Sequence, residues 1–372
     1  MRKTWLCLLS LFLSLVLLSP LCIPSAAASV SGECACLYLP QNNAFIFEKN
    51  ADRRHPMAST TKIMTALVVL EQVALDEIVT VSPEAAGIEG SSIYLQVGNQ
   101  FTVEDLLYAL LLASANDAAT ALAIHVAGNE EAFAALMNEK AEALSLSDTH
   151  FTNPHGLYHE EHYTTAKELA KITATALENE TFARIVATKS KVIYSADKET
   201  VRTLSNHNKL LRAYNDCVGV KTGFTKNSGR CLVSAAERDG MQLIAVTLDA
   251  PDDWRDHTAM LDLGFSLYQG YSLADGISFQ IPVVGGVADS VGLSPKNPIT
   301  VVLPKETDAP SLSLEINHFA VAPIRRGQVL GMAYYTQSDK TVAAIPLLAE
   351  EGVAAVPKKQ SLLDKIKHLF NL

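Results

Sequence analysis

Basic residues are scarce in this 372-residue sequence, which has 30 lysines and arginines against 40 aspartates and glutamates. The net charge of −10 argues against a nucleic-acid partner, because phosphate binding needs a basic surface. Charged residues make up only 19% of the chain and apolar residues 48%, which excludes a largely disordered protein. A single hydrophobic core rarely serves a chain of this length, so we expect two domains.

An apolar run at the N-terminus, residues 5–18, has about 14 residues, fewer than the ~20 that a membrane-spanning helix needs. Arg2 and Lys3 precede this run, and Ala26-Ala27-Ala28 follow it, which is the pattern of a secretory signal peptide with its cleavage site. A retained membrane helix is the alternative. We therefore predict that residues 1–28 are a signal peptide and that the rest of the chain is exported.

Cysteine is also rare, and four cysteines remain after the leader: Cys34, Cys36, Cys217 and Cys231. Export permits disulfides, but this arrangement does not demand them. Cys34 and Cys36 are two apart in a strand-like run, so both point to the same face and cannot bridge easily. We expect all four to be small, buried apolar residues.

Strand signals stand at both ends of the first 250 residues, and helical patterns lie between them. The strand signals are five short runs bounded by turn residues: 33–39, 44–48, 217–224, 230–237 and 242–248. Helical patterns dominate from about 59 to 188 and include the stretches 103–126 and 165–187. This order predicts an α+β domain in which helices flank an antiparallel sheet and form a helical insertion.

The C-terminal third has a different pattern. The Gly- and Ser-punctuated segment 264–276 indicates a boundary between a domain of residues 29–272 and one of residues 273–352. In the second domain, Pro and Gly turns separate short β-rich runs at 299–303, 312–316 and 341–345, which favours a small all-β domain.

Residues 353–372 are predicted to be a linker followed by an amphipathic helix. Five apolar side chains fall within an arc of roughly 120° at helical spacing: Leu362, Leu363, Ile366, Leu369 and Phe370. Lys365 and Lys367 flank this arc, which favours an anchor lying on an anionic membrane surface. The alternative is a terminal helix that docks on its own domain.

Three short motifs appear in order: Ser59-Thr60-Thr61-Lys62, Ser114-Ala115-Asn116 and Lys221-Thr222-Gly223. The first two carry little weight singly, since Ser195-Ala196-Asp197-Lys198 also fits the first pattern. A Ser and a Lys three residues apart share one helix face, where the amine can take the proton of a nucleophilic hydroxyl. Lysine serves as a base only if burial or a second cation lowers its pKa, and Lys221 is a candidate for that cation.

The other two motifs suit substrate binding. Polar groups in the apolar surroundings of Ser114 and Asn116 need partners, which favours a proton relay for Ser114 and a substrate amide for Asn116. Lys221 and Thr222 offer a charge and a hydroxyl to a terminal carboxylate. Gly223 on an edge strand leaves room for a peptide alongside. In a hairpin that turns near residue 227, Cys231 falls opposite Gly223.

Taken alone, each motif also has a structural reading: Ser59 as a helix cap, Lys62 as a solvated lysine, the polar pair as a buried network, and residues 221–223 as a strand and turn. His155, His159 and His162 lie close together, but Pro154 and Gly156 interrupt any helix and no His-Glu-x-x-His pattern appears. We therefore expect these histidines to belong to a loop that packs beside the three motifs rather than to bind a metal.

The sequence resembles the low-molecular-mass penicillin-binding proteins, specifically the serine-type D-alanyl-D-alanine carboxypeptidases. Eight matching stretches occur in order: 48–52, 57–65, 90–95, 102–108, 151–157, 162–166, 208–211 and 219–225. The resemblance implies a β-lactamase/transpeptidase-like fold, a second β-rich domain and a membrane-anchoring tail. It also implies removal of the terminal D-alanine from peptidoglycan stem pentapeptides, acylation by β-lactam antibiotics, and no cofactor.

The resemblance places the nucleophile at Ser59, the general base at Lys62, and the second-motif pair at Ser114 and Asn116. Lys221 becomes the third-motif cation, and backbone N–H groups of Ser59 and Phe224 form the oxyanion hole. Ala115 and Lys226 depart from the usual pattern and bear on substrate preference alone. Two alternatives are a β-lactamase, for which the Glu-x-x-Leu-Asn pattern is missing between residues 116 and 221, and a non-catalytic wall-binding protein.

Overall fold

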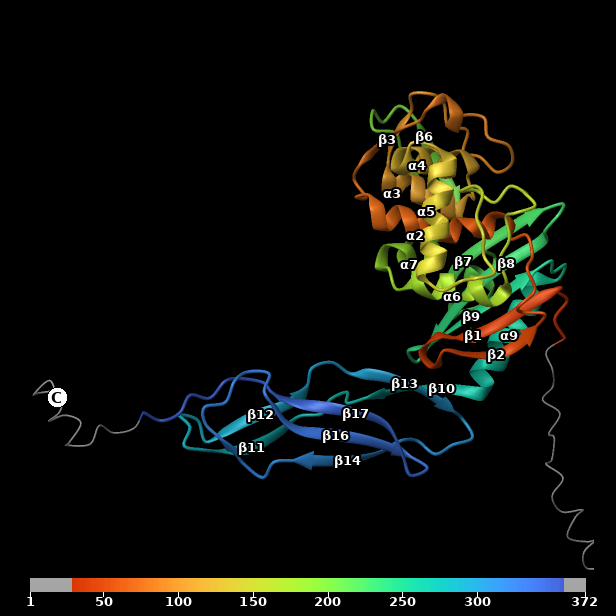
Figure 1. Ribbon diagram of the computed structural model, residues 1–372. Helices are drawn as coiled ribbons and strands as arrows, with labels where there is room; N and C mark the ends of the chain where they lie inside the picture. The colour runs from red at the N-terminus through yellow and green to blue at the C-terminus, as the bar shows by residue number, and fades with distance from the viewer. Residues whose placement is uncertain (1–28, 358–372) are drawn as a thin grey trace, which may run out of the picture.

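The computed structural model describes residues 29–357, so the predicted signal peptide and the amphipathic arc of the predicted anchor lie outside the described residues. At its centre is a five-stranded antiparallel sheet of order β2-β1-β9-β8-β7 (Figure 1). Its strands are β1 (Cys34–Leu39), β2 (Ala44–Lys49), β7 (Cys217–Thr225), β8 (Gly229–Arg238) and β9 (Met241–Leu248). These strands match the five sequence predictions to within one residue at each end.

The interior strand β1 is buried along its whole length because both faces of the sheet are covered. Cys34 and Cys36 belong to the core beneath the helical region, whereas Ala35 and Leu37 belong to the core on the other face. The prediction that the two cysteines share a face is therefore confirmed. All four cysteines are free thiols, but Cys217 is only half-buried, contrary to our expectation that all four are buried.

Helices cover both faces of the sheet. The helices are η3 (Ala58–Thr61), α2 (Lys62–Gln72), α3 (Val103–Leu112), α4 (Asn116–Ala127), α5 (Glu130–Ala143), α6 (Ala166–Leu177), α7 (Glu180–Ala187), α8 (Leu210–Ala213) and α9 (Asp253–Leu267). On one face the core contains β1 and β9 side chains together with α2 and α6, and on the other face α9 supplies Met260, Leu261 and Phe265. The predicted antiparallel sheet with a helical insertion is thus what the chain forms.

Two helices predicted as continuous are interrupted. The stretch 103–126 breaks between α3 and α4, where Ser114 adopts a φ of +59° that no helix tolerates. The stretch 165–187 breaks between α6 and α7, where the Asn179 side chain accepts hydrogen bonds from two backbone N–H groups and starts a new helix. Apolar periodicity continues across both breaks, so it does not reveal them.

Short elements complete the first part of the chain. They are the hairpins β3 (Ile78–Thr80) with β4 (Gln100–Thr102) and β5 (Ser190–Tyr194) with β6 (Val201–Ser205), and the single turns η2 (Pro40–Asn42) and η4 (Pro83–Ala85).

The C-terminal part is all β and extends away from the helical region as a separate arm (Figure 1). It contains β10 (Tyr268–Leu273), β11 (Phe279–Val284), β12 (Ser290–Pro295), β13 (Ile299–Pro304), β14 (Ser311–Ile316), β15 (Ala320–Val321), β16 (Val329–Gln337) and β17 (Lys340–Ala349). Six strands form one sheet of order β14-β16-β17-β12-β11-β15, while β10 pairs with β13. The three predicted runs correspond to β13, β14 and β17.

The junction differs from the prediction at one point. Residues 264–267 were expected to belong to a boundary segment, but they form the last turn of α9, which continues directly into β10. Gly264 lets this helix lie close to the sheet, since a Cβ there would fall 2.5 Å from a Leu243 methyl group. The arm contacts the sheet domain through Val302, whose carbonyl accepts a hydrogen bond from Asn42 at 3.1 Å and whose side chain joins the α9 core.

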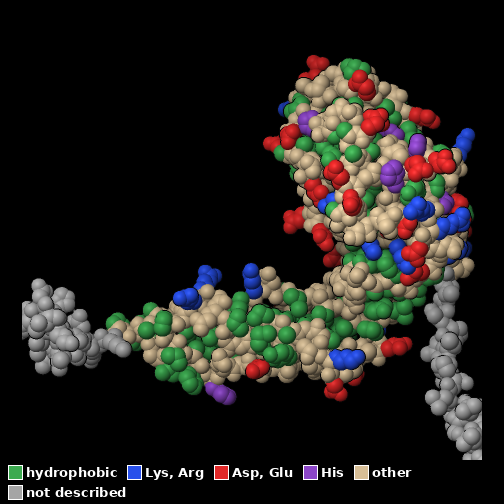
Figure 2. Space-filling view, in the orientation of Figure 1, with side chains coloured by type: hydrophobic (Ala, Val, Ile, Leu, Met, Phe, Trp, Pro, Cys, Tyr) green, Lys and Arg blue, Asp and Glu red, His purple; other side chains and the backbone are tan. Residues whose placement is uncertain are grey.

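Apolar side chains are visible along the arm, whereas charged side chains gather on the helical part (Figure 2). The exposed ones on the arm include Leu312, Leu314 and Phe319. Among residues 29–357, no helix combines the length and the apolar character needed to cross a membrane.

Replacing Gly264 with valine tests the close approach of α9. The added side chain must push Leu243 and Leu37 aside, so we expect Gly264→Val to lower the free energy of unfolding by about 1–3 kcal/mol. Urea denaturation of Gly264→Val measures this change. The exposed neighbour on the same helix, in Ser266→Ala, provides the control, with a change within about 0.5 kcal/mol. Equal midpoints for the two variants would contradict the packing argument.

Candidate active site

Ser59 lies in the single turn η3, and Lys62 begins helix α2 directly after it. The two side chains therefore sit one turn apart, as the Ser-x-x-Lys spacing predicts, and Lys62 Nζ lies 3.0 Å from Ser59 Oγ. The sequence suggested that residues 59–62 open a regular helix. Instead, the turn is tighter, and Ala58 at its start has a φ of +47°. This turn presents the hydroxyl of Ser59 at the edge of the helix.

Lys62 is completely buried, and its Nζ donates two hydrogen bonds besides the contact with Ser59. The acceptors are Asn116 Oδ1 at 2.7 Å and the His155 backbone carbonyl at 2.6 Å. Burial lowers the pKa of Lys62 well below its usual range, and the positive charge of Lys221 lowers it further, against the opposing effect of Asp117. The sequence argument named burial or a second cation as the cause of a lowered pKa, and the structure supplies both.

Lys221 lies on β7, which is an edge strand of the sheet as predicted. Its side chain is 1% exposed, and burial lowers its pKa to about 7. Its Nζ donates to the Thr222 backbone carbonyl at 2.9 Å. A buried lysine with one neutral acceptor and a second buried amine nearby retains the capacity to bind an anion.

The second motif occupies the break between α3 and α4. Asn116 uses both ends of its amide, since Oδ1 accepts from Lys62 and Nδ2 donates to the Glu89 carbonyl at 2.5 Å. Ser114 is 4% exposed and faces the same cavity as Ser59. Among the described residues, no hydrogen bond joins the Ser114 hydroxyl to Lys62, and Asn116 holds that amine instead.

Gly223 lies where β7 passes close to η3. A Cβ on Gly223 would lie 3.1 Å from the Ser59 backbone nitrogen and 3.2 Å from the Ala58 Cβ. Glycine at this position therefore accommodates the Ser59 turn, whereas the sequence argument had assigned the space to a bound peptide. In the β7–β8 pairing, Gly223 faces Cys231, which confirms the predicted hairpin register.

A cavity of about 350 Å³ opens between these elements. The residues that line it are Ser59, Ser91, Ser114, His207, Lys209, Thr222, Gly223, Phe224, Arg230, Asp253 and Trp254. Phe224 is 66% exposed at its rim. Of the eight predicted site residues, five line the cavity, while Lys62, Asn116 and Lys221 lie buried behind it. The Ser59 hydroxyl in the cavity thus contacts the amine of Lys62, whose pKa is lowered, and the amine of Lys221, whose pKa is also lowered, lies nearby.

Sequence reasoning missed Asp117, which is fully buried beside the second motif. Its carboxylate accepts from Ser92 Oγ at 2.6 Å and from the Leu95 backbone N–H at 2.9 Å. These bonds hold the segment that carries Ser91 against the cavity. A charged residue in the apolar run after Asn116 was the available signal, because a buried carboxylate needs several donors.

The segment 150–163 packs against η3, as expected for a loop beside the site. A Cβ on Gly156, whose φ is +87°, would lie 1.9 Å from the Ala58 carbonyl oxygen. His162 Nδ1 accepts from the Thr152 N–H at 3.0 Å, so its Nε2 carries the proton toward Thr61 Oγ1 at 2.7 Å. Burial lowers the pKa of His162 to about 3, which makes it a neutral hydrogen-bonding residue.

Comparison with known proteins agrees with this geometry. A family model described as D-alanyl-D-alanine carboxypeptidase matches residues 24–252, and one described as penicillin-binding protein 5, C-terminal domain, matches residues 273–355. The D-alanyl-D-alanine carboxypeptidase DacF of Bacillus subtilis is 32% identical over 321 residues, which cover 83% of this chain and 82% of that protein.

Solved structures show the same fold. Penicillin-binding protein 5 from Haemophilus influenzae has a TM-score of 0.64 and 27% identity, with coverage of 88% of this chain and 98% of that one. The DD-transpeptidase of Streptomyces K15 has a TM-score of 0.61 and 33% identity, with coverage of 64% and 98% respectively. Because the first family model matches more than half of the sequence, we conclude that this chain belongs to the D-alanyl-D-alanine carboxypeptidase family.

Proposed function

We propose that the protein is a serine-type D-Ala-D-Ala carboxypeptidase that removes the terminal D-alanine from peptidoglycan stem pentapeptides through an acyl-enzyme on Ser59. One observation carries this proposal: the buried amine of Lys62 lies 3.0 Å from a hydroxyl that lines an open cavity. A serine hydroxyl becomes nucleophilic when an adjacent base takes its proton, and a lysine of lowered pKa is such a base.

In the first step, Ser59 Oγ attacks the carbonyl carbon of the penultimate D-alanine while Lys62 Nζ takes its proton. Backbone N–H groups of Ser59 and Phe224 stabilise the resulting oxyanion. The C–N bond then breaks, and the terminal D-alanine leaves after its amine receives a proton through Ser114. The position of Ser114 on the cavity wall supports this assignment.

In the second step, water attacks the ester carbonyl, the Ser59–acyl bond breaks, and Ser59 regains its proton. β-Lactams present a similar acyl group, so they acylate Ser59, and the slow second step leaves the adduct in place. A fast second step is what separates a β-lactamase from this enzyme, so the lifetime of the adduct distinguishes the two functions.

The remaining residues bind the substrate. We assign the terminal carboxylate to Lys221 and Thr222, because buried Lys221 has only a neutral carbonyl as its hydrogen-bond partner in the described residues. The peptide runs along the exposed edge of β7 at Gly223 and Phe224. Asn116 receives the substrate amide after its Nδ2 releases the Glu89 carbonyl. No cofactor takes part in these steps.

We further propose that the catalytic domain spans residues 29–272 and the β-rich domain residues 273–352. Tyr268, at the start of β10, packs against the α9 core, whereas the buried residues of the separate arm core begin at Leu273, which supports a boundary at the end of β10. Residues 1–28 act as the signal peptide, and residues 353–372 hold the exported enzyme on the outer face of the cytoplasmic membrane. The last described residues lie at the end of the arm remote from the helical region, which supports an anchor that follows them (Figure 1).

Replacement of the nucleophile tests the activity directly. Purified wild-type protein is expected to release D-alanine from a diacylated Lys-D-Ala-D-Ala tripeptide and to form a penicillin adduct on the peptide that contains Ser59. Ser59→Ala should lose D-alanine release by on the order of 10⁴-fold or more and should form no adduct. Ser195→Ala, in the second Ser-x-x-Lys sequence, is the control and keeps both properties. An adduct on any other residue would refute the assignment.

The pH dependence of acylation tests the coupling of the two lysines. Only neutral Lys62 accepts a proton, so acylation rises with pH through the pKa of Lys62. The charge of Lys221 lowers that pKa, so Lys221→Gln should move the rising limb to higher pH as well as weaken binding. Stopped-flow measurement of β-lactam acylation across pH 5–10 records the limb. If the acylation rate of Lys221→Gln rises over the same pH range as that of the wild type, burial alone sets the pKa of Lys62.

Deletion of residues 358–372 tests the membrane anchor. The full chain should sediment with vesicles that contain anionic phospholipids, because apolar side chains and lysines act together at such a surface. The truncated chain should stay in the supernatant and keep its carboxypeptidase activity. Equal partition of the two proteins would show that the tail is not the anchor.

A further inference from the structure

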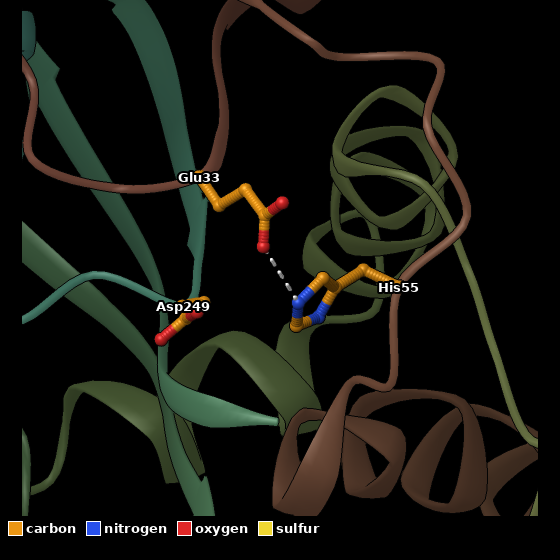
Figure 3. Close-up of side chains that lie close together, drawn as sticks. All are labelled: Glu33, His55 and Asp249. Atoms are coloured by element: carbon orange, nitrogen blue, oxygen red, sulfur yellow. Dashed lines mark ion pairs between the residues drawn. The ribbon is translucent and has the colours of Figure 1, made fainter. Parts of the chain in front are cut away.

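Away from the cavity, Glu33, His55 and Asp249 bring one ligand atom each within 4.8 Å of one another. The three come from different segments: Glu33 precedes β1, Asp249 follows β9, and His55 lies in the connection between β2 and η3 (Figure 3). We propose that these residues bind a zinc ion that fastens the segment leading to Ser59 onto the central strands of the sheet.

The histidine is oriented as a metal ligand. Its side chain is 9% exposed, and its Nδ1 lies 2.9 Å from the Pro56 carbonyl oxygen. A carbonyl only accepts hydrogen bonds, so Nδ1 carries the proton, and Nε2 presents its lone pair when the ring is neutral. Metal-bound histidines are commonly held by this kind of bond from the second ring nitrogen to a carbonyl.

The distance between His55 and Glu33 also suits a bridging cation. His55 Nε2 and Glu33 Oε2 are 3.6 Å apart, which is too long for a hydrogen bond (Figure 3). Two ligands at 2.0–2.2 Å from a tetrahedral zinc ion lie about 3.3–3.6 Å apart. Oε1 of Glu33 forms an ion pair with Arg53, and Oε2 faces His55 and is available to bind the ion.

Backbone hydrogen bonds hold all three residues in position. The Glu33 N–H donates to the Asp249 carbonyl at 2.9 Å, and the His55 N–H donates to the Thr164 carbonyl at 2.8 Å. A Cβ on Gly229 would lie 1.9 Å from Asp249 Oδ1, so glycine at 229 leaves the space that this carboxylate occupies. Glu33 and His55 are therefore arranged before any ion arrives, whereas the Asp249 carboxylate, which points away from them in Figure 3, must turn to complete the site.

One imidazole and two carboxylates match zinc, which accepts nitrogen and oxygen ligands in sites with a water molecule in the fourth position. The ion would affect the active site by restraining the polypeptide that leads to Ser59. His55 is followed after three residues by Ser59, and the intervening Met57 and Ala58 contact Gly223 on β7. Zinc would thus restrain the polypeptide on one side of the nucleophile without touching the substrate.

Titration calorimetry with zinc chloride, on full-length protein freed of metal with a chelator, tests the site. One ion per chain is expected, and saturating zinc should raise the Tm by about 5 °C, since binding to the folded state alone stabilises it. Asp249→Asn and His55→Gln should each weaken zinc binding at least tenfold and remove the shift in Tm. Asparagine also adopts positive φ, so Asp249→Asn retains the backbone at this position, where φ is +50°.

His125→Gln is the matched control, because His125 and Glu77 form another histidine–carboxylate pair at 3.2 Å. This variant should bind zinc as the wild type does. Absence of zinc binding to the wild type, or binding that survives Asp249→Asn and His55→Gln, would overturn the proposal and leave Glu33 and His55 as an ion pair alone. Neither result depends on carboxypeptidase activity, so the test is separate from that of the proposed function.

Discussion

The active-site arrangement depends on the burial of one amine. Lys62 has no exposed surface, and the free energy of keeping an ammonium there without a counter-ion is high, so its pKa falls. Its partners are an amide oxygen, a backbone carbonyl and the Ser59 hydroxyl, all of them neutral. The lowered pKa of this base therefore follows from where the chain places the side chain rather than from its chemical type.

Several elements unrelated in sequence are needed to produce that burial. The segment 150–163 supplies the His155 carbonyl, the first residue of α4 supplies the Asn116 side chain, and β7 supplies Lys221. Two glycines allow these segments to lie close to η3, because Gly156 and Gly223 leave room for Ala58 and Ser59. A side chain at position 156 would displace the turn that carries the hydroxyl, and one at position 223 would press against it. The geometry of the nucleophile is thus maintained by backbone contacts on two sides.

Parts of the molecule far from the cavity are also connected to the η3 turn that carries Ser59. The proposed zinc ligands lie at the ends of β1 and β9 and just before η3, so they connect the central sheet with the segment that carries Ser59. On the opposite face of the sheet, α9 packs closely at Gly264 and continues into the β-rich arm. The sheet therefore links the active site with the arm, and its rigidity comes from burial on both faces.

The amino-acid sequence by itself determined the strands, their order of appearance, the β-rich second part and the three motifs, because alternation, turn residues and short spacings are local properties. It also predicted the Ser59–Lys62 contact, since three residues of helix-like turn fix that distance. It did not reveal the breaks at Ser114 and Asn179, because apolar periodicity runs through them. Nor did it predict that Asn116 binds Lys62, that Gly223 accommodates the Ser59 turn, or that Glu33, His55 and Asp249 meet. These depend on contacts between segments 22 to 216 residues apart, and only tertiary packing brings such segments together.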